Sequence, residues 1–397
     1  MQSGVQTRSR KSQLKTRNDE NAIIVSKQVA KTINTRSRSR VPLVPIDTNP
    51  ISKRSTRTEK DCKRQKLCVG KNLFSAELRR FSSPVRSIAI QFFKQRCAIR
   101  VKCMAKNPSI FLELDKDFGH VHKIDNHIAE CSFDYLQMKS ILAFHLEQNF
   151  MKHCVGLNPR MRYILVDWMV QVHSSFRLLT DTLYLAIGLL DQFLQKACDI
   201  VTKNTFQLVG ITTLYIAAKY EEMFPPDVHQ FCNITEGAFC ASQILDCEIL
   251  ILNKLDFDMV IPTPYLFLRR LLLALRANSL TQNMAKYFLE VGYQEYNIVH
   301  YGPNCLAAMA VCLARAVVTN QPILEKVWDD RISFISGLLI DDIREPLITM
   351  ARGVYRQKEP SKYRSTYTKF GSNDAFQRVS TLPQMESKTM RLIAGEP

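Results

Sequence analysis

The fold is decided by one stretch, Met161-Arg162-Tyr163-Ile164-Leu165-Val166-Asp167-Trp168-Met169-Val170-Gln171-Val172. Five apolar residues in it recur at helical spacing and form one stripe: Met161, Ile164, Leu165, Trp168 and Val172. Tyr163, Val166 and Val170 form a second stripe on another face. A helix that is apolar on more than one face is covered on more than one side. The stretch therefore predicts either the central helix of a large helical core or a helix that keeps one stripe open for docking.

Two charged residues interrupt this apolar helix. Arg162 and Asp167 lie five positions apart, too far around the helix to pair with each other. A buried charge needs a compensating partner. We therefore expect each of them to find its partner on a different element.

The charge of the chain is concentrated at its N-terminal end. Residues 1–106 contain 26 of the 54 Lys and Arg but 6 of the 37 Asp and Glu, so they carry a net +20, and the remainder carries −3. Their apolar residues are scattered without a sustained period, and such a segment cannot bury enough surface to offset its ordering entropy. We predict that residues 1–125 are a disordered basic tail. Such a tail could contact nucleic-acid phosphates, but a carrier of regulatory motifs is the simpler interpretation.

Several classes of protein are not expected. Residues 1–10 are polar, so we expect no secretory signal, and no run approaches the ~20 apolar residues that a membrane span requires. The twelve cysteines form no Cys-x-x-Cys pair, and the eight histidines show no metal-ligand spacing. No phosphate-binding glycine loop and no nucleophile-plus-base motif occurs. We expect no metal, no cofactor and no membrane contact.

Helical periodicity dominates from about residue 132, and no stretch has the alternation of a strand followed by hairpin residues. The expected helices include 206–222, 241–255, 284–293, 304–318 and 340–355. Ile261-Pro262-Thr263-Pro264 interrupts the pattern as a linker does. The sequence predicts an all-α fold of two tandem helical domains, residues 126–260 and 261–384, with a short C-terminal tail, residues 385–397.

Several longer motifs resemble those of the cyclin family, especially its mitotic B type. The resemblance covers about residues 128–384 and rests on the opening stretch together with Phe176-Arg177-Leu178-Leu179, Leu189-Leu190-Asp191-Gln192-Phe193-Leu194, Ala217-Ala218-Lys219-Tyr220-Glu221-Glu222-Met223 and Val379-Ser380-Thr381-Leu382-Pro383-Gln384. Asn304 stands where the family often has Ser at a helix start, and Asn is an equally good N-cap. Gln192 replaces the family's usual Arg, and Phe206 replaces its usual Leu. The resemblance implies two tandem cyclin-box domains.

The resemblance also implies a function without catalysis. Cyclins are regulatory subunits that form a heterodimer with a cyclin-dependent protein kinase and reposition the αC helix of that kinase. A B-type cyclin acts at the G2/M transition and is removed by ubiquitin-dependent proteolysis. The chain is therefore expected to bind such a kinase and to be recognised by the ubiquitin ligase of mitotic exit.

Matched position by position, the resemblance assigns roles to four charged residues. Lys219 and Glu248 fall on the pair with which cyclins contact the kinase. The alternative is an ordinary pair of solvated surface charges, which contributes little. Arg162 and Asp191 match a pair that ties two helices of the first box, and this role is structural.

A docking patch is the second site implied by the resemblance. Substrates and inhibitors that carry an Arg-x-Leu motif would bind an exposed apolar patch made of Met161, Ile164, Leu165, Trp168, Phe206 and Gln207. The alternative is that these residues simply pack in the core. Two apolar stripes on one helix favour an open patch, since one stripe suffices for a bundle.

The basic tail contains two Arg-x-x-Leu segments of the kind that mark mitotic cyclins for destruction. One has Arg40, Leu43 and Asn49, and the other has Arg64, Leu67 and Asn72. We expect one of the two to be the degron, although the bare pattern is short enough to arise by chance. Ser83-Pro84-Val85-Arg86 has the form of a proline-directed phosphorylation site at Ser83. The basic clusters at 36–40 and 63–66 permit nuclear import, so both cytoplasmic and nuclear localisation are expected.

A different class of protein fits the same outline. A transcription factor built of two cyclin-like boxes would use basic residues to hold DNA. The net charge of −3 on residues 107–397 argues against a DNA-binding core, so nucleic acid is not an expected partner. Salt-sensitive DNA retention by residues 130–390 would favour this alternative.

Overall fold

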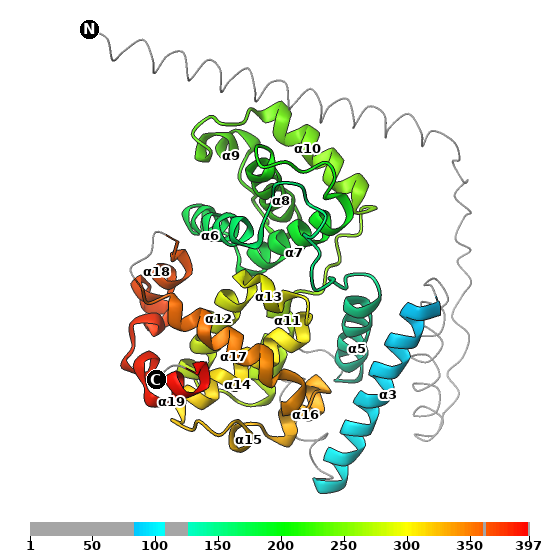
Figure 1. The fold of residues 1–397 in the computed structure, drawn as a ribbon, viewed down its shortest axis with the longest axis vertical. Coiled ribbons are helices and arrows are strands. Elements are labelled where there is room, and N and C mark those ends of the chain that lie inside the picture. The colour runs from blue at the N-terminus through cyan, green and yellow to red at the C-terminus, as the bar shows by residue number, and fades with distance from the viewer. Residues whose placement is uncertain (1–82, 108–125, 360–362, 396–397) are drawn as a thin grey trace, which may run out of the picture.

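The computed structural model describes residues 83–107, 126–359 and 363–395, and within these ranges it contains helices and no strand (Figure 1). The predicted all-α class is confirmed. None of the described helices combines the length and the apolarity needed to cross a bilayer.

The first domain is a bundle that follows helix α5 (Asn126–Leu142). Its helices are α6 (Pro159–Phe176), α7 (Thr180–Ala197), α8 (Phe206–Glu221), α9 (Val228–Ile234) and α10 (Ala241–Lys254). Helix α8 lies inside the bundle because it has small residues at its contacts. A Cβ built on Gly210 would lie 2.7 Å from a methyl carbon of Leu165, so only glycine lets α6 approach α8 this closely.

Helix α6 begins and ends with recognisable capping. The Asn158 side chain accepts a hydrogen bond from the Met161 backbone N–H at 2.9 Å, and Pro159 takes the first helical position, where no backbone donor is needed. At the other end, Arg177 adopts a left-handed conformation with φ 54°. These two caps fix where the decisive helix starts and stops.

The second domain begins at the proline linker. Its helices are α11 (Pro264–Ala274), α12 (Ser279–Gln294), α13 (Tyr296–Val299), α14 (Pro303–Val318), α15 (Leu324–Val327), α16 (Asp330–Ser336), α17 (Ile340–Arg356) and α18 (Ser365–Ser372). Three short 3-10 turns, Asp374–Phe376, Val379–Thr381 and Pro383–Glu386, lead to α19 (Lys388–Ala394). Helix α14 is buried along nearly its whole length and forms the centre of this domain. Asn304 does not cap α14: it is the second helical residue, and its buried amide donates to the Ser336 carbonyl at 2.8 Å.

The prediction that residues 1–125 are disordered is wrong for residues 83–106. They form helix α3 (Ser83–Lys106), which lies alongside α5 and reaches α16 (Figure 1). Ala89, Ile99 and Cys103 are buried, and so is Arg96, whose guanidinium pairs with Asp134 at 2.7 Å. Because an arginine occupies the centre of the buried stripe, the apolar period is interrupted in the sequence and could not be recognised there.

The C-terminal residues also depart from the expected tail. Ser387 accepts a hydrogen bond from the Met390 N–H, which starts α19. Met390 and Ile393 are buried against the second domain. Residues 388–394 therefore belong to the folded domain rather than to a tail.

Candidate functional site

Lys219 and Glu248 form an ion pair between two helices of the first domain. Lys219 lies near the end of α8 and Glu248 in the middle of α10, and their Nζ and Oε1 atoms are 2.5 Å apart. The ammonium group also lies 4.4 Å from the centroid of the Tyr215 ring. Side-chain exposure is 39% for Lys219 and 11% for Glu248, so Lys219 faces solvent while Glu248 is shielded. The arrangement presents a positive charge at the surface, and the more buried Glu248 carboxylate holds that ammonium group in place.

The sequence of α10 explains why Glu248 lies at this edge. Ile244, Cys247 and Ile251 are buried and face the bundle, whereas Leu245 and Ile249 are 40% exposed. A residue between those two stripes lies at the boundary between core and solvent. There the carboxylate can accept a hydrogen bond from the Lys219 ammonium on α8 and still keep some contact with water.

Several large apolar side chains close to this ion pair in the sequence are exposed. Tyr220 is 52% exposed, and Met223 and Phe224, just after α8, are 84% and 87% exposed. With Leu245 and Ile249 they form what we call the α8–α10 surface. Aromatic and methionine side chains are enriched at protein interfaces, so these exposed residues make the surface a candidate for binding a partner. These exposed residues were not among the predicted site residues, although the run Tyr220-Glu221-Glu222-Met223-Phe224 at a helix end was a visible signal.

The predicted docking patch is only partly at the surface. Met161, Ile164 and Trp168 are partly exposed, and Gln207 is exposed. The expectation that all six residues are exposed is wrong for Leu165 and Phe206, which are 5% and 4% exposed. Leu165 packs on Gly210, so it supports the patch from beneath instead of lining it.

Arg162 and Asp191 form a bidentate ion pair with two separations of 2.7 Å. Both side chains are fully buried. Arg162 also donates to the carbonyls of Gln294 at 2.9 Å and Tyr293 at 3.2 Å, so it joins α6 and α7 to the end of α12 in the second domain. Burial alone would lower the pKa of the guanidinium, but the neighbouring Asp191 carboxylate outweighs it and raises this pKa.

Asp167, the other charge inside α6, has its partner on α18. Its two carboxylate oxygens accept from the backbone N–H and the hydroxyl of Ser365, each at 2.7 Å. Burial raises the pKa of the Asp167 carboxyl, and these two hydrogen bonds oppose the rise. The expectation that Arg162 and Asp167 pair with different elements is thus confirmed. The Asp167–Ser365 hydrogen bonds and the bonds from Arg162 to the α12 carbonyls hold α6 against the second domain.

The structure does not place the side chains of the remaining predicted site residues. The degron candidates Arg40, Leu43, Asn49, Arg64, Leu67 and Asn72 all lie outside the described residues. Ser83 is the first residue of α3, and its side chain is not among those described. No group of three His, Cys, Asp or Glu with the arrangement of a metal site occurs in the described part of the chain.

Comparison with protein families matches both domains. Residues 132–260 match the cyclin N-terminal domain, and residues 262–385 match the cyclin C-terminal domain. A solved viral cyclin from herpesvirus saimiri superposes with a TM-score of 0.48 at 19% identity, over 55% of this chain and 96% of that one.

Similar curated proteins are mitotic cyclins. G2/mitotic-specific cyclin-B2 of Gallus gallus is 37% identical over 265 residues, which are 66% of this chain and 64% of that protein. Its counterpart in Homo sapiens is 39% identical over 60% of this chain and 58% of that protein. The counterpart in Rana japonica is 32% identical over 72% of this chain and 70% of that protein. The chain thus spans about three-fifths of the length of the first two relatives, and with its two matched domains it belongs to the cyclin family and resembles the B type.

Proposed function

We propose that this chain is a non-catalytic regulatory subunit that binds and activates a mitotic cyclin-dependent protein kinase and so controls the G2/M transition. The observation that carries the proposal is the α8–α10 surface, which combines the Lys219–Glu248 ion pair with exposed apolar side chains on the same two helices and just after α8. The similarity to G2/mitotic-specific cyclins supports the choice of partner and favours it over DNA.

The mechanism follows from differential binding. A kinase αC helix that alternates between two positions is shifted by a partner that binds only one of them. In the bound position the αC Glu pairs with the β3 Lys, which phosphoryl transfer requires. A shift from mostly inactive to mostly active needs about 5.5 kcal/mol of differential binding. Tyr220 and Phe224 are exposed aromatic side chains of the kind that supply much of the binding energy at an interface.

Substrate selection is assigned to a second surface. Met161, Ile164, Trp168 and Gln207 would receive substrates or inhibitors that carry an Arg-x-Leu motif, with Leu165 and Phe206 as the packed base. These residues belong to α6 and the start of α8, whereas Lys219 is near the opposite end of α8. One cyclin could therefore hold the kinase and a substrate at the same time.

Removal at mitotic exit completes the proposed role. One of the Arg-x-x-Leu segments, at Arg40 or Arg64, would be recognised by a ubiquitin ligase. The protein would act in both the cytoplasm and the nucleus, and phosphorylation at Ser83 would be one of its modifications.

The test of the kinase-binding assignment is the double variant Lys219→Ala/Glu248→Ala. Truncating charges at an interface centre typically costs about 2–5 kcal/mol, so we expect kinase activation to be lost while the helical circular dichroism is unchanged. Glu325→Ala/Arg344→Ala is a matched control, because this exposed ion pair joins α15 to α17 in the second domain, away from the α8–α10 surface. Wild-type binding and activation by the Lys219/Glu248 variant would refute the assignment.

A further inference from the structure

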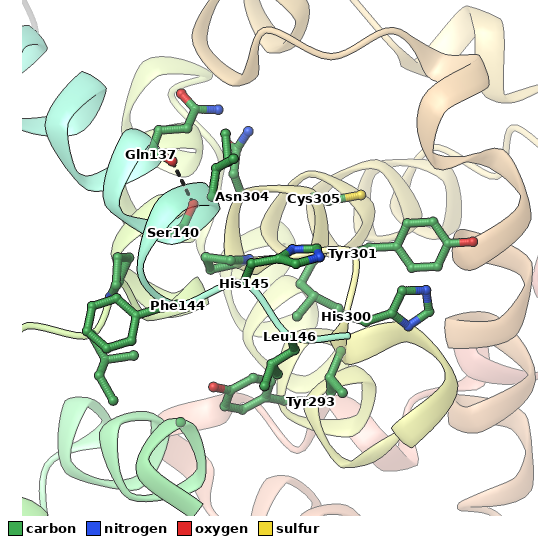
Figure 2. Close-up of a pocket in the computed structure, with 18 of the residues that line it drawn as sticks. Gln137, Ser140, Phe144, His145, Leu146, Tyr293, His300, Tyr301, Asn304 and Cys305 are labelled. Atoms are coloured by element: carbon green, nitrogen blue, oxygen red, sulfur yellow. Dashed lines mark hydrogen bonds between the residues drawn. The ribbon is translucent and has the colours of Figure 1, made fainter. Parts of the chain in front are cut away.

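A cavity of about 150 Å³ lies where the two cyclin domains meet. Its walls come from α5, from the segment after α5, from α7, from the proline linker and from the connection between α13 and α14 (Figure 2). No residue of α8 or α10 contributes to the described lining, so the cavity is separate from the α8–α10 surface. A molecule bound here would touch both domains at once.

One buried polar group in the lining has an unused acceptor. Gln192 on α7 is 3% exposed, and its Nε2 donates to the Phe144 carbonyl at 2.8 Å. This donation fixes the orientation of the amide, and Oε1 then has no hydrogen-bond partner among the described residues. A buried acceptor without a donor costs about 1–3 kcal/mol. A ligand with an N–H or O–H group at this position would remove that cost.

A second unpartnered atom lies across the junction. Nδ1 of His300, in the turn before α14, is buried and has no partner in the described structure. Burial lowers the pKa of His300, and the neighbouring His145 lowers it further, so the imidazole is neutral at physiological pH. A neutral ring nitrogen offers a ligand one donor or one acceptor, but no charge.

The remaining described lining is a mixture of aromatic, aliphatic and neutral polar residues and carries no formal charge. Among the described residues that line the cavity, none is Asp, Glu, Lys or Arg, and burial raises the pKa of the Cys305 thiol to about 12. A charged ligand would therefore be buried without a counter-ion. Six aromatic rings contribute to the walls: Phe92, Phe144, His145, Tyr293, His300 and Tyr301. An engineered apolar cavity of about 150 Å³ is known to hold one benzene molecule, so this volume is sufficient for one small aromatic ring.

We propose that this junction cavity is a binding site for a small, uncharged aromatic molecule that carries one N–H or O–H donor. The donor bonds Gln192 Oε1, and the ring packs among Phe144, Tyr293 and Tyr301. Because both domains supply the walls, binding stabilises their contact and raises the melting temperature.

The experiment compares indole with 1-methylindole, which has the same ring system but no N–H, on the full chain. Binding is measured by saturation-transfer NMR and by melting temperature. We expect indole to bind about tenfold more tightly than 1-methylindole, the effect of one buried hydrogen bond. Equal affinities, or no binding of either compound because the cavity holds water only, would overturn the proposal.

Two variants locate the donor contact. Gln192→Met keeps an unbranched side chain but removes the acceptor. The affinity of indole relative to that of 1-methylindole should therefore fall from about tenfold to within about twofold. Gln282→Met is the matched control, because Gln282 on α12 also donates its amide to a backbone carbonyl, that of Ala277 at 2.7 Å, and neither residue lines the cavity. If Gln192→Met does not fold, a crystal structure of the wild-type chain with indole decides the question. Indole placed anywhere but within hydrogen-bond distance of Gln192 Oε1 contradicts the assignment.

Discussion

Arg162 and Asp191 face each other in two parallel hydrogen bonds of 2.7 Å, and neither side chain reaches solvent. The same guanidinium donates to two carbonyls at the end of α12. Arg162 therefore joins its own helix α6, the neighbouring helix α7 and the second domain. Its substitution tests how strongly the two domains depend on each other.

We predict that Arg162→Ala lowers the free energy of unfolding by about 3–5 kcal/mol, because it leaves Asp191 charged and buried without a partner. The double variant Arg162→Met/Asp191→Leu should recover part of this loss, since it removes both charges. Recovery is incomplete because the carbonyls of Tyr293 and Gln294 still lose their donor. Urea denaturation measures all three proteins, and a loss below about 1 kcal/mol for Arg162→Ala would contradict the structural role.

The docking patch is tested by Met161→Ala/Trp168→Ala. We expect kinase activation to persist, whereas phosphorylation of a substrate with an Arg-x-Leu motif weakens about tenfold, equivalent to about 1.4 kcal/mol. A substrate without the motif should be unaffected. Leu339→Ala/Leu392→Ala, two exposed leucines of the second domain, provides a control of the same chemical kind. An equal loss on both substrates, or unfolding seen by circular dichroism melting, would show that the stripe is core.

Helix α3 is tested through Arg96, which pairs with Asp134 and packs against Gly337. Gly337 has φ 68°, and a Cβ there would lie 2.5 Å from the Arg96 side chain, so glycine is required on both counts. We predict that Arg96→Ala speeds amide hydrogen exchange across residues 87–106 about tenfold. Lys94→Ala, on the exposed side of α3, should leave exchange unchanged. Identical exchange in the two variants would mean that Arg96 does not hold the helix.

The degron is tested in an extract that degrades mitotic cyclins. Arg40→Ala/Leu43→Ala and Arg64→Ala/Leu67→Ala are compared with the combined variant by following protein half-life. We expect one pair of substitutions to extend the half-life as much as the combination does. If the combined variant disappears at the normal rate, neither segment is the degron.

The spacing of apolar residues in the sequence was sufficient to predict most of the helices. Helices α8, α10, α14 and α17 begin and end within one or two residues of the predicted ranges, because each has a continuous apolar face bounded by a turn or a proline. Helix α3 was missed because its buried stripe contains Arg96. Helix α19 was missed because seven residues are too short for a periodic signal.

The sites were harder to derive from the sequence. Spacing along α6 places Ile164 and Leu165 on one stripe, but only the position of Gly210 on α8 decides that Leu165 turns inward. The 2.5 Å contact of Lys219 with Glu248 joins two helices across 29 positions and has no local signal. The cavity beside Gln192 arises from both domains, so it could not be anticipated from either one.

The most direct test of the central claim is a kinase assay with purified, monomeric cyclin-dependent kinase and the full chain. The rate of phosphate transfer to a substrate without an Arg-x-Leu motif is measured with and without the chain. The account predicts a rise of about a hundredfold, as the active arrangement moves from roughly 1% to 99% of the kinase. A chain that neither binds the kinase nor changes this rate, yet retains DNA in a salt-sensitive manner, would contradict the account and favour the transcription-factor alternative.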